Sequence, residues 1–181
     1  FTTTAISVAS LAQGAVALAV STTDAAGNSG SNTGATSKDS AAPNLTLGTL
    51  AVINNANRTS YGFTGACETT RSTVSYALVS GATVSGTVTC TASAYTVAGV
   101  DVTTLTDGSV TVTVNQTDAV GNPATASHTV TKDTVNPTVT FTTTPVITSV
   151  NQAAYAVSGT CSENGRTVSV TIGGLPATAT C

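Results

Sequence analysis

The segment LTDGSVTVTVNQTDAVGNPATASHTVTKDTVNP, residues 105–137, decides the fold. Near its start valine alternates with threonine, so that Val110, Val112 and Val114 lie on one face of an extended chain. A period of two in β-branched residues predicts a strand with one buried face. Gly-Asn in the following turn and renewed alternation in residues 124–132 predict a second strand that closes the domain.

Most of this segment occurs twice. Residues 23–43, TDAAGNSGSNTGATSKDSAAP, match residues 117–137 with a constant offset of 94 positions. The same offset continues along the chain and slips by three residues only before Cys181. The repetition therefore predicts three parts: the C-terminal half of one repeat over 1–43, a complete repeat over 44–137, and the N-terminal half of a third repeat over 138–181.

Composition limits the class of protein. Charged residues make up only 7% of the 181 residues and the net charge is −3, so no basic patch is expected to bind nucleic acid. A mean hydropathy of +0.26 argues against disorder. The sequence has no run of 18 apolar residues, so we expect no membrane insertion in this segment. Because the pattern starts in the middle of a repeat and without Met, we interpret the chain as a piece of a longer protein.

The complete repeat shows a period of two and no helical period. Short strands are expected over residues 44–50, 61–67, 73–79, 84–90, 95–105, 110–117 and 124–132. Seven such strands separated by turn residues, in a repeat of this length, are typical of a β-sandwich. The predicted fold class is therefore all-β, built from antiparallel β-sandwich domains.

Four motifs in a fixed order give the chain a resemblance to a known family. They are the Gly-Thr-Cys turn, the Leu-x-Asp-Gly turn, the Thr-Asp-Ala-x-Gly-Asn loop and the Lys-Asp-x-x-x-Pro linker. With these motifs the chain resembles the bacterial Ig-like repeats of large extracellular surface adhesins and biofilm-associated proteins. The resemblance implies that each domain is an immunoglobulin-like antiparallel β-sandwich of seven strands. It also implies that such domains follow one another in tandem, end to end, on an exported protein and are often stiffened by Ca²⁺ at the junctions. One departure is Gln13, which stands where the complete repeat has Asp107.

The four cysteines form two equivalent pairs, Cys67 with Cys90 and Cys161 with Cys181. Each pair lies at the ends of neighbouring inward-facing strand patterns, which favours one disulfide per pair and an oxidising, extracellular compartment. A metal site is the first alternative, although the chain has one His and no Cys-x-x-Cys. Buried free thiols are the second alternative. A disulfide that closes a loop of about 22 residues would stabilise the fold by roughly 3 kcal/mol.

Seven of the eight carboxylates fall in turns or linkers at the predicted ends of domains. Six of them form two candidate metal groups: Asp39, Glu68 and Asp118 at one junction, and Asp107, Asp133 and Glu163 at the other. Oxygen ligands gathered in this way suit a structural Ca²⁺ ion, in line with the resemblance. The alternative is that these aspartates form turns, in which their side chains accept hydrogen bonds from nearby backbone N–H groups.

No set of residues indicates catalysis, and we predict that the protein is not an enzyme. His128 is alone in a predicted strand, and its equivalent in the repeat is Gly34. No serine or cysteine can be matched with a base and an orienting acid, and no carboxylates are paired as in a glycosidase. Lys38 and Lys132, beside the linker aspartates, are expected to be solvated charges.

The repeat and the family resemblance together imply two functions. The first is a structural stalk or fibre module of an extracellular bacterial adhesin, which gives length and stiffness for adhesion or biofilm formation and has neighbouring repeats as its partners. The alternative is a subunit of an extracellular filament, in which half-repeats of neighbouring copies complete each other by strand addition. A lectin-like module is less favoured because the repeats have no aromatic-rich loop.

Overall fold

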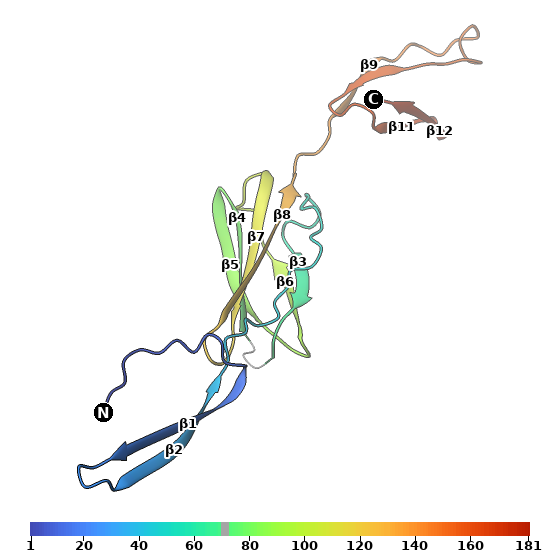
Figure 1. Ribbon diagram of the computed structural model, residues 1–181. Helices are drawn as coiled ribbons and strands as arrows, with labels where there is room; N and C mark the ends of the chain where they lie inside the picture. Colours follow the sequence, from blue (N-terminus) through green and yellow to red (C-terminus); the bar gives the residue numbers. More distant parts are fainter. Residues whose placement is uncertain (70–72) are drawn as a thin grey trace. The chain divides into compact units, whose positions relative to one another are not determined.

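The structure is a computed structural model that describes residues 1–69 and 73–181. Over these residues all the regular elements are β-strands, every strand pair is antiparallel, and no helix occurs (Figure 1). This confirms the all-β, antiparallel prediction. The chain divides into two compact units, Phe1–Lys132 and Asp133–Cys181. The three-part division at residues 43 and 137 stays a prediction.

The first unit starts with a hairpin and continues with the residues of the predicted complete repeat. The hairpin consists of β1 (Gly14–Thr23) and β2 (Ser29–Lys38). The complete repeat contains β3 (Tyr61–Ala66), β4 (Thr73–Ser80), β5 (Ala82–Thr89), β6 (Ala94–Val100), β7 (Gly108–Thr117) and β8 (Pro123–Lys132). One sheet has the order β5-β4-β7-β8 and the other pairs β3 with β6. This arrangement is compatible with an Ig-like sandwich.

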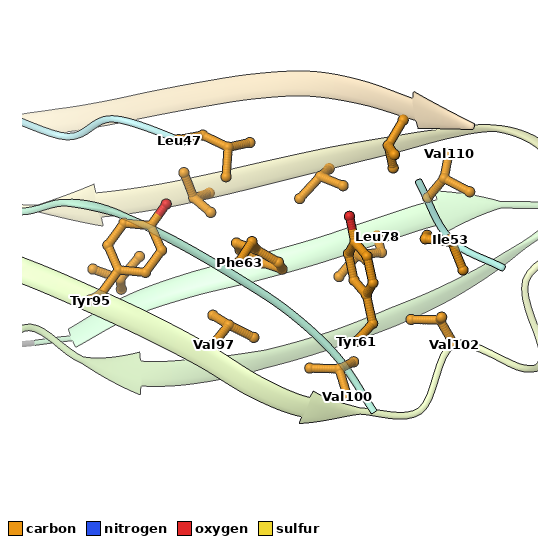
Figure 2. Packing of buried hydrophobic residues seen from close by; sticks show 14 of the residues in the cluster. Leu47, Ile53, Tyr61, Phe63, Leu78, Tyr95, Val97, Val100, Val102 and Val110 are labelled. Atoms are coloured by element: carbon orange, nitrogen blue, oxygen red, sulfur yellow. The ribbon is translucent and has the colours of Figure 1, made fainter. Parts of the chain in front are cut away.

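The core of the complete repeat lies between these two sheets (Figure 2). Val110, Val112 and Val114 of β7 are all fully buried, as their alternation predicts. From the other sheet, Phe63 of β3 and Val97 of β6 belong to the same cluster. The period of two in β7 therefore places one apolar face against the opposite sheet.

Residues 44–50, predicted as a strand, are held beside β3 without forming a regular strand. The N–H groups of Thr46 and Gly48 donate to carbonyl oxygens of β3 at 3.0 and 2.9 Å. The hydroxyl of the buried Tyr95 donates to the carbonyl oxygen of Thr46 at 2.8 Å. A side chain at Gly65 would collide with that carbonyl and with the Tyr95 hydroxyl, so only glycine allows this close approach.

The strand predicted over residues 95–105 ends at Val100. Asp101 stops it, because its carboxylate accepts hydrogen bonds from the N–H group of Thr103 at 2.9 Å and from its hydroxyl at 2.6 Å. This turn still returns Val102 and Leu105 to the core, where both are buried.

The second unit contains two small sheets. β9 (Val139–Thr143) pairs with β10 (Ser158–Cys161), and β11 (Thr167–Ile172) pairs with β12 (Leu175–Thr180). Its local contacts copy those of the complete repeat at the 94-residue offset. The Tyr155 hydroxyl donates to the carbonyl oxygen of Pro145 at 2.7 Å, as that of Tyr61 does to Ala51 at 2.7 Å.

Candidate functional site

The loop between β7 and β8 is closed by one carboxylate. Oδ1 of Asp118 accepts hydrogen bonds from the N–H groups of Val120, Gly121 and Asn122 at 2.7–2.9 Å. Oδ2 accepts one from the side-chain amide of Asn122 at 2.7 Å. Burial favours the neutral acid, but the hydrogen bonds from Asn122 and the loop backbone outweigh it and lower the pKa of Asp118. Asp118 therefore acts here as the cap of its own loop.

The loop between β1 and β2 has the same structure. Oδ1 of Asp24 accepts from the N–H groups of Ala26 and Asn28, and Oδ2 accepts from the Asn28 amide at 2.9 Å. The side-chain hydrogen bond from Asn28 is the main cause of the lowered pKa of Asp24. Gly27 has a φ of 91° and Gly121 one of 105°, which explains the glycine before each asparagine. The Thr-Asp-Ala-x-Gly-Asn motif thus encodes a carboxylate-capped turn.

The three acids predicted at the first junction lie near one end of the complete repeat. Asn122, in the Asp118 loop, donates from its side chain to the main-chain carbonyl of Asp39 at 3.4 Å. Gln116 binds the backbone of Glu68 twice: its Oε1 accepts from the N–H group at 2.9 Å and its Nε2 donates to the carbonyl at 2.6 Å. These contacts connect the linker and two loops through amide side chains.

Gln116 is a structural residue that the sequence interpretation missed. It is almost fully buried, and both ends of its amide are hydrogen-bonded to Glu68. A polar side chain in line with Val110, Val112 and Val114 is the signal that would have indicated it, because buried amides need partners.

The other end of the repeat is organised by a buried cation. Nζ of Lys132 donates to the main-chain carbonyls of Leu105 and Thr103 and lies 3.6 Å from a carboxylate oxygen of Asp107. The lysine side chain is only 4% exposed, so the expectation of a solvated charge was wrong. Asp107, a predicted metal ligand, forms an ion pair with this lysine.

The same lysine contact recurs in the first hairpin. Nζ of Lys38 donates to the carbonyls of Ala9 and Leu11 at 2.8 and 2.6 Å. Gln13, which replaces the aspartate, exchanges two hydrogen bonds with Ser40 instead. In both copies, the lysine of the Lys-Asp-x-x-x-Pro linker is the last residue of the second hairpin strand, β2 or β8. Its hydrogen bonds hold that strand to the turn that precedes the first hairpin strand, β1 or β7.

Asp133 and Glu163 both belong to the second unit. Asp133 accepts a hydrogen bond from the N–H group of Val135 at 3.0 Å, as Asp39 does from Ala41 at 3.1 Å. Glu163 lies 3.7 Å from Arg166, three residues further on, in an exposed ion pair. Each of these carboxylates is engaged locally.

No ready-made group of metal-binding side chains occurs in the part of the chain that the structure describes. Among residues 1–69 and 73–181, no three His, Cys, Asp or Glu side chains are grouped so that they could hold a metal ion. The carboxylates of Asp118 and Asp107 serve the loop and Lys132, respectively. The arrangement present here fits the turn-forming alternative, and calcium binding stays a prediction.

Both cysteine pairs are joined as disulfides in the structure. Cys67 follows β3 and Cys90 follows β5, so the bond between them connects the two sheets across the core. Both residues are buried, at 2% and 4% exposure. The Cys161–Cys181 bond connects the ends of β10 and β12 in the same way. The complete repeat and the second unit thus each have a cross-link between sheets.

The fold and these recurring sites define a class of protein: a chain of all-β units that repeats every 94 residues. No protein-family model matches the chain, and the comparison with curated proteins gives no match. In the described residues the structure has no helical segment with the length and apolarity of a membrane span.

Three solved structures are similar to this chain. A tetra-tandem repeat in the extending region of a large adhesion protein is 25% identical over 98% of this chain and 48% of its own, with a TM-score of 0.48. A Ca²⁺-stabilized adhesin that helps an Antarctic bacterium reach out and bind ice is 29% identical over 92% of this chain and 46% of its own, with a TM-score of 0.41. A 1.5-MDa bacterial ice-binding adhesin is 24% identical over 93% of this chain and 60% of its own, with a TM-score of 0.43.

The chain spans about half the length of the solved structures that it matches.

Proposed function

We propose that the chain is a non-catalytic structural module of an extracellular bacterial surface adhesin, in which tandem repeats provide length and stiffness. The observation that carries the proposal is the recurrence of whole contact sets at the 94-residue offset. The capped loop at Asp24 returns at Asp118, and the lysine contact of Lys38 returns at Lys132. Selection for a repeated scaffold explains why such contacts recur in place of a single specialised site.

The disulfides support an extracellular location. Structural disulfides persist in oxidising compartments, and one cross-link in each of the two units stabilises that unit independently of the other. The Cys67–Cys90 bond also shields the segment between its cysteines, which are 23 positions apart, from extension under force.

Single-molecule stretching of the chain between two marker domains tests the stalk function. We expect a discrete, high-force unfolding event for residues 44–137. Adding a reductant should lengthen that event by roughly 75 Å, because the segment closed by the disulfide then extends at about 3.3–3.6 Å per residue. A chain that extends without a discrete event would contradict the proposal.

Calcium at the junctions is a separate part of the proposal. Its candidate ligands remain Asp39, Glu68 and Asp118 at one junction and Asp107, Asp133 and Glu163 at the other. Melting the chain in EDTA and in excess CaCl₂ tests it, with MgCl₂ as the control for ionic strength. A melting temperature that is the same in all three buffers would remove calcium from the proposed function.

A filament subunit is the second candidate function, because apolar side chains of the partial repeats are exposed. Leu18 on β1 is 51% exposed and Phe141 on β9 is 63% exposed, although their equivalents in the complete repeat are buried. Intermolecular completion of a repeat would cover such side chains.

A further inference from the structure

The two edges of the four-stranded sheet of the complete repeat are built differently. β8 begins at Pro123, which has no N–H group to offer a further strand, and Ile53 forms a parallel bridge to Lys132 near its end. β5 forms the opposite edge of the sheet (Figure 1). In the part of the chain that the structure describes, β5 pairs only with β4. Its other side is therefore a template for a further strand.

β5 also lacks the devices that usually protect an edge strand. Its sequence, ATVSGTVT over residues 82–89, contains no charged residue and no proline. Its inward-facing Val84 and Val88 pack against the core but are only partly buried. By contrast, β12, which pairs with β11 as β5 pairs with β4, has Pro176 in its second position. A regular, uncharged edge with half-covered valines favours association with another strand.

The sequence of β5 reads nearly the same in both directions. Residues 83–89 are TVSGTVT, so that Gly86 has a hydroxyl residue one position away on each side, a valine two positions away and a threonine three positions away. An antiparallel pair of identical strands about a twofold axis needs this symmetry, because residue i contacts residue j and j contacts i. The strand that matches β5 is therefore β5 of a second copy.

Tyr76 adds a polar group at the centre of this edge. It is the partner of Gly86 in the pairing of β4 with β5, and a Cβ atom at Gly86 would lie only 2.5 Å from the Tyr76 hydroxyl. The ring packs edge-on against Phe63, with 5.9 Å between the ring centroids, which fixes its direction. The tyrosine side chain thus crosses the glycine toward the open edge of the sheet.

We infer that β5 is the interface of a homodimer, in which the β5 strands of two copies pair antiparallel about a twofold axis at Gly86. Val84 then faces Val88 of the other copy, and Ser85 faces Thr87. Burial of the valines provides the driving force, and the backbone ladder fixes the register. The two Tyr76 hydroxyls lie over the facing glycines, where one can donate a hydrogen bond to the other.

This pairing joins the four-stranded sheets of two copies into one continuous sheet, and it closes after two copies because the interface is isologous. Antiparallel pairing makes the two complete repeats point in opposite directions. Modules on one cell surface point the same way, whereas modules from facing surfaces meet in opposite directions. The interface therefore suits cohesion between facing cells, a role that rests on the proposed function as a stalk module.

Charged substitutions on the exposed face of β5 test the interface in the full chain. Sedimentation equilibrium over a concentration series should show the wild-type chain in equilibrium between a monomer and a dimer. Ser85→Lys combined with Thr87→Lys puts like charges directly opposite each other and should weaken dimerisation by roughly ten-fold or more. Ser85→Glu combined with Thr87→Glu should do the same. An equimolar mixture of the two variants should recover the dimer, which also shows that both are folded.

The matched control places the same charges on the other edge of the same sheet. Thr129 and Thr131 are exposed on β8 with the same spacing, so Thr129→Lys combined with Thr131→Lys should dimerise like the wild-type chain. A monomeric wild-type chain, open-ended aggregates in place of a dimer, or equal weakening in the β5 and β8 variants would overturn the inference.

Cysteine cross-linking tests the register. All four native cysteines are in disulfides, so added thiols report on the new contact. A mixture of the Ser85→Cys chain with the Thr87→Cys chain should form mixed covalent dimers on mild oxidation. Ser85→Cys mixed with Thr83→Cys is the control: position 83 lies four residues from the facing position and should cross-link at least several-fold less.

Equal cross-linking in the two mixtures, or none in either, would refute the proposed register. The stretching event expected for residues 44–137 is measured on single chains and does not depend on this contact. A failure of the dimer would therefore leave the stalk function intact, and a failure of the stretching test would leave the dimer measurable.

Discussion

Lys132, the last residue of β8, donates a hydrogen bond from its buried ammonium group to the main-chain carbonyl of Leu105. The bond spans 27 residues and recurs between Lys38 and Leu11. A cation at this position holds the end of the last strand to the turn before β7. The exit of the chain from the complete repeat is therefore fixed by a side chain and not by the strand ladder alone.

Replacing this lysine should destabilise the complete repeat. Lys132→Met keeps the aliphatic stem but leaves the carbonyls of Leu105 and Thr103 without their donor, and we expect a loss of about 2 kcal/mol in the free energy of unfolding. Urea denaturation of the full chain measures it. Lys38→Met is the matched control and should leave the main transition unchanged, because that hairpin lies outside the core; a similar loss in both variants would contradict this account.

The Asp118 loop predicts a stability loss in acid. Because the folded pKa is lowered below its ordinary 3.8, the stabilisation is complete above about pH 4 and is lost as the pH falls through the folded pKa. Asp118→Ala should lower the melting temperature at pH 7 and reduce its dependence on pH below 4. Thermal melts at pH 2–7 measure both effects. Asp24→Ala is the control and should leave the melting temperature of the main transition unchanged. If Asp118→Ala keeps the full loss of stability in acid, another group causes that loss.

Tyr95 predicts a loss of stability in alkali. Burial raises its pKa from 10 to about 12, so its contribution is complete below pH 10 and is lost as the pH rises through 12. Tyr95→Phe should remove part of this loss, and it should cost about 1 kcal/mol at pH 7 because the hydrogen bond to Thr46 disappears. Denaturation curves between pH 7 and pH 12 test this. Tyr155→Phe, in the other unit, should leave the main transition unaffected, and an unchanged alkaline profile in Tyr95→Phe would disprove the assignment.

The two disulfides should act on separate units. Removing Cys67 and Cys90 together, as a double alanine variant, should lower the unfolding free energy of the complete repeat by roughly 3 kcal/mol. The matched variant without Cys161 and Cys181 should leave that transition in place. Tyrosine fluorescence during denaturation measures the unfolding free energy of both variants. A loss of the same size in both would mean that the two units unfold together.

Local periodicity predicted most of the complete repeat. The alternation of Val110, Val112 and Val114 was sufficient for β7, and the equivalent cysteines were sufficient for the disulfides. The strand predicted over residues 95–105 was too long. The turn that ends it depends on the contact of the Asp101 side chain with Thr103, which no periodic pattern reveals. Residues 44–50 lack a full ladder, although their apolar positions had indicated a strand.

The roles of charged and amide side chains could not be predicted in the same way. The burial of Lys132 depends on carbonyls that only the folded turn brings together, and isolated lysines are usually solvated. Gln116 and Glu68 are 48 positions apart, so their contact is invisible without the topology. The motif at Asp118 is consistent with both an ion ligand and a turn cap, and only the geometry of its N–H donors favours the cap here.

The Asp24 loop also bears on the order of events during folding. It forms the same carboxylate-capped turn as the Asp118 loop, although the side chains of its hairpin are largely exposed. Information for this turn therefore lies within five consecutive residues, and hairpins with such local contacts form in about 1–10 μs. We expect the β7–β8 turn to nucleate early in each repeat, so that the non-local contacts of β3, β4 and β6 assemble on a hairpin whose register is already set.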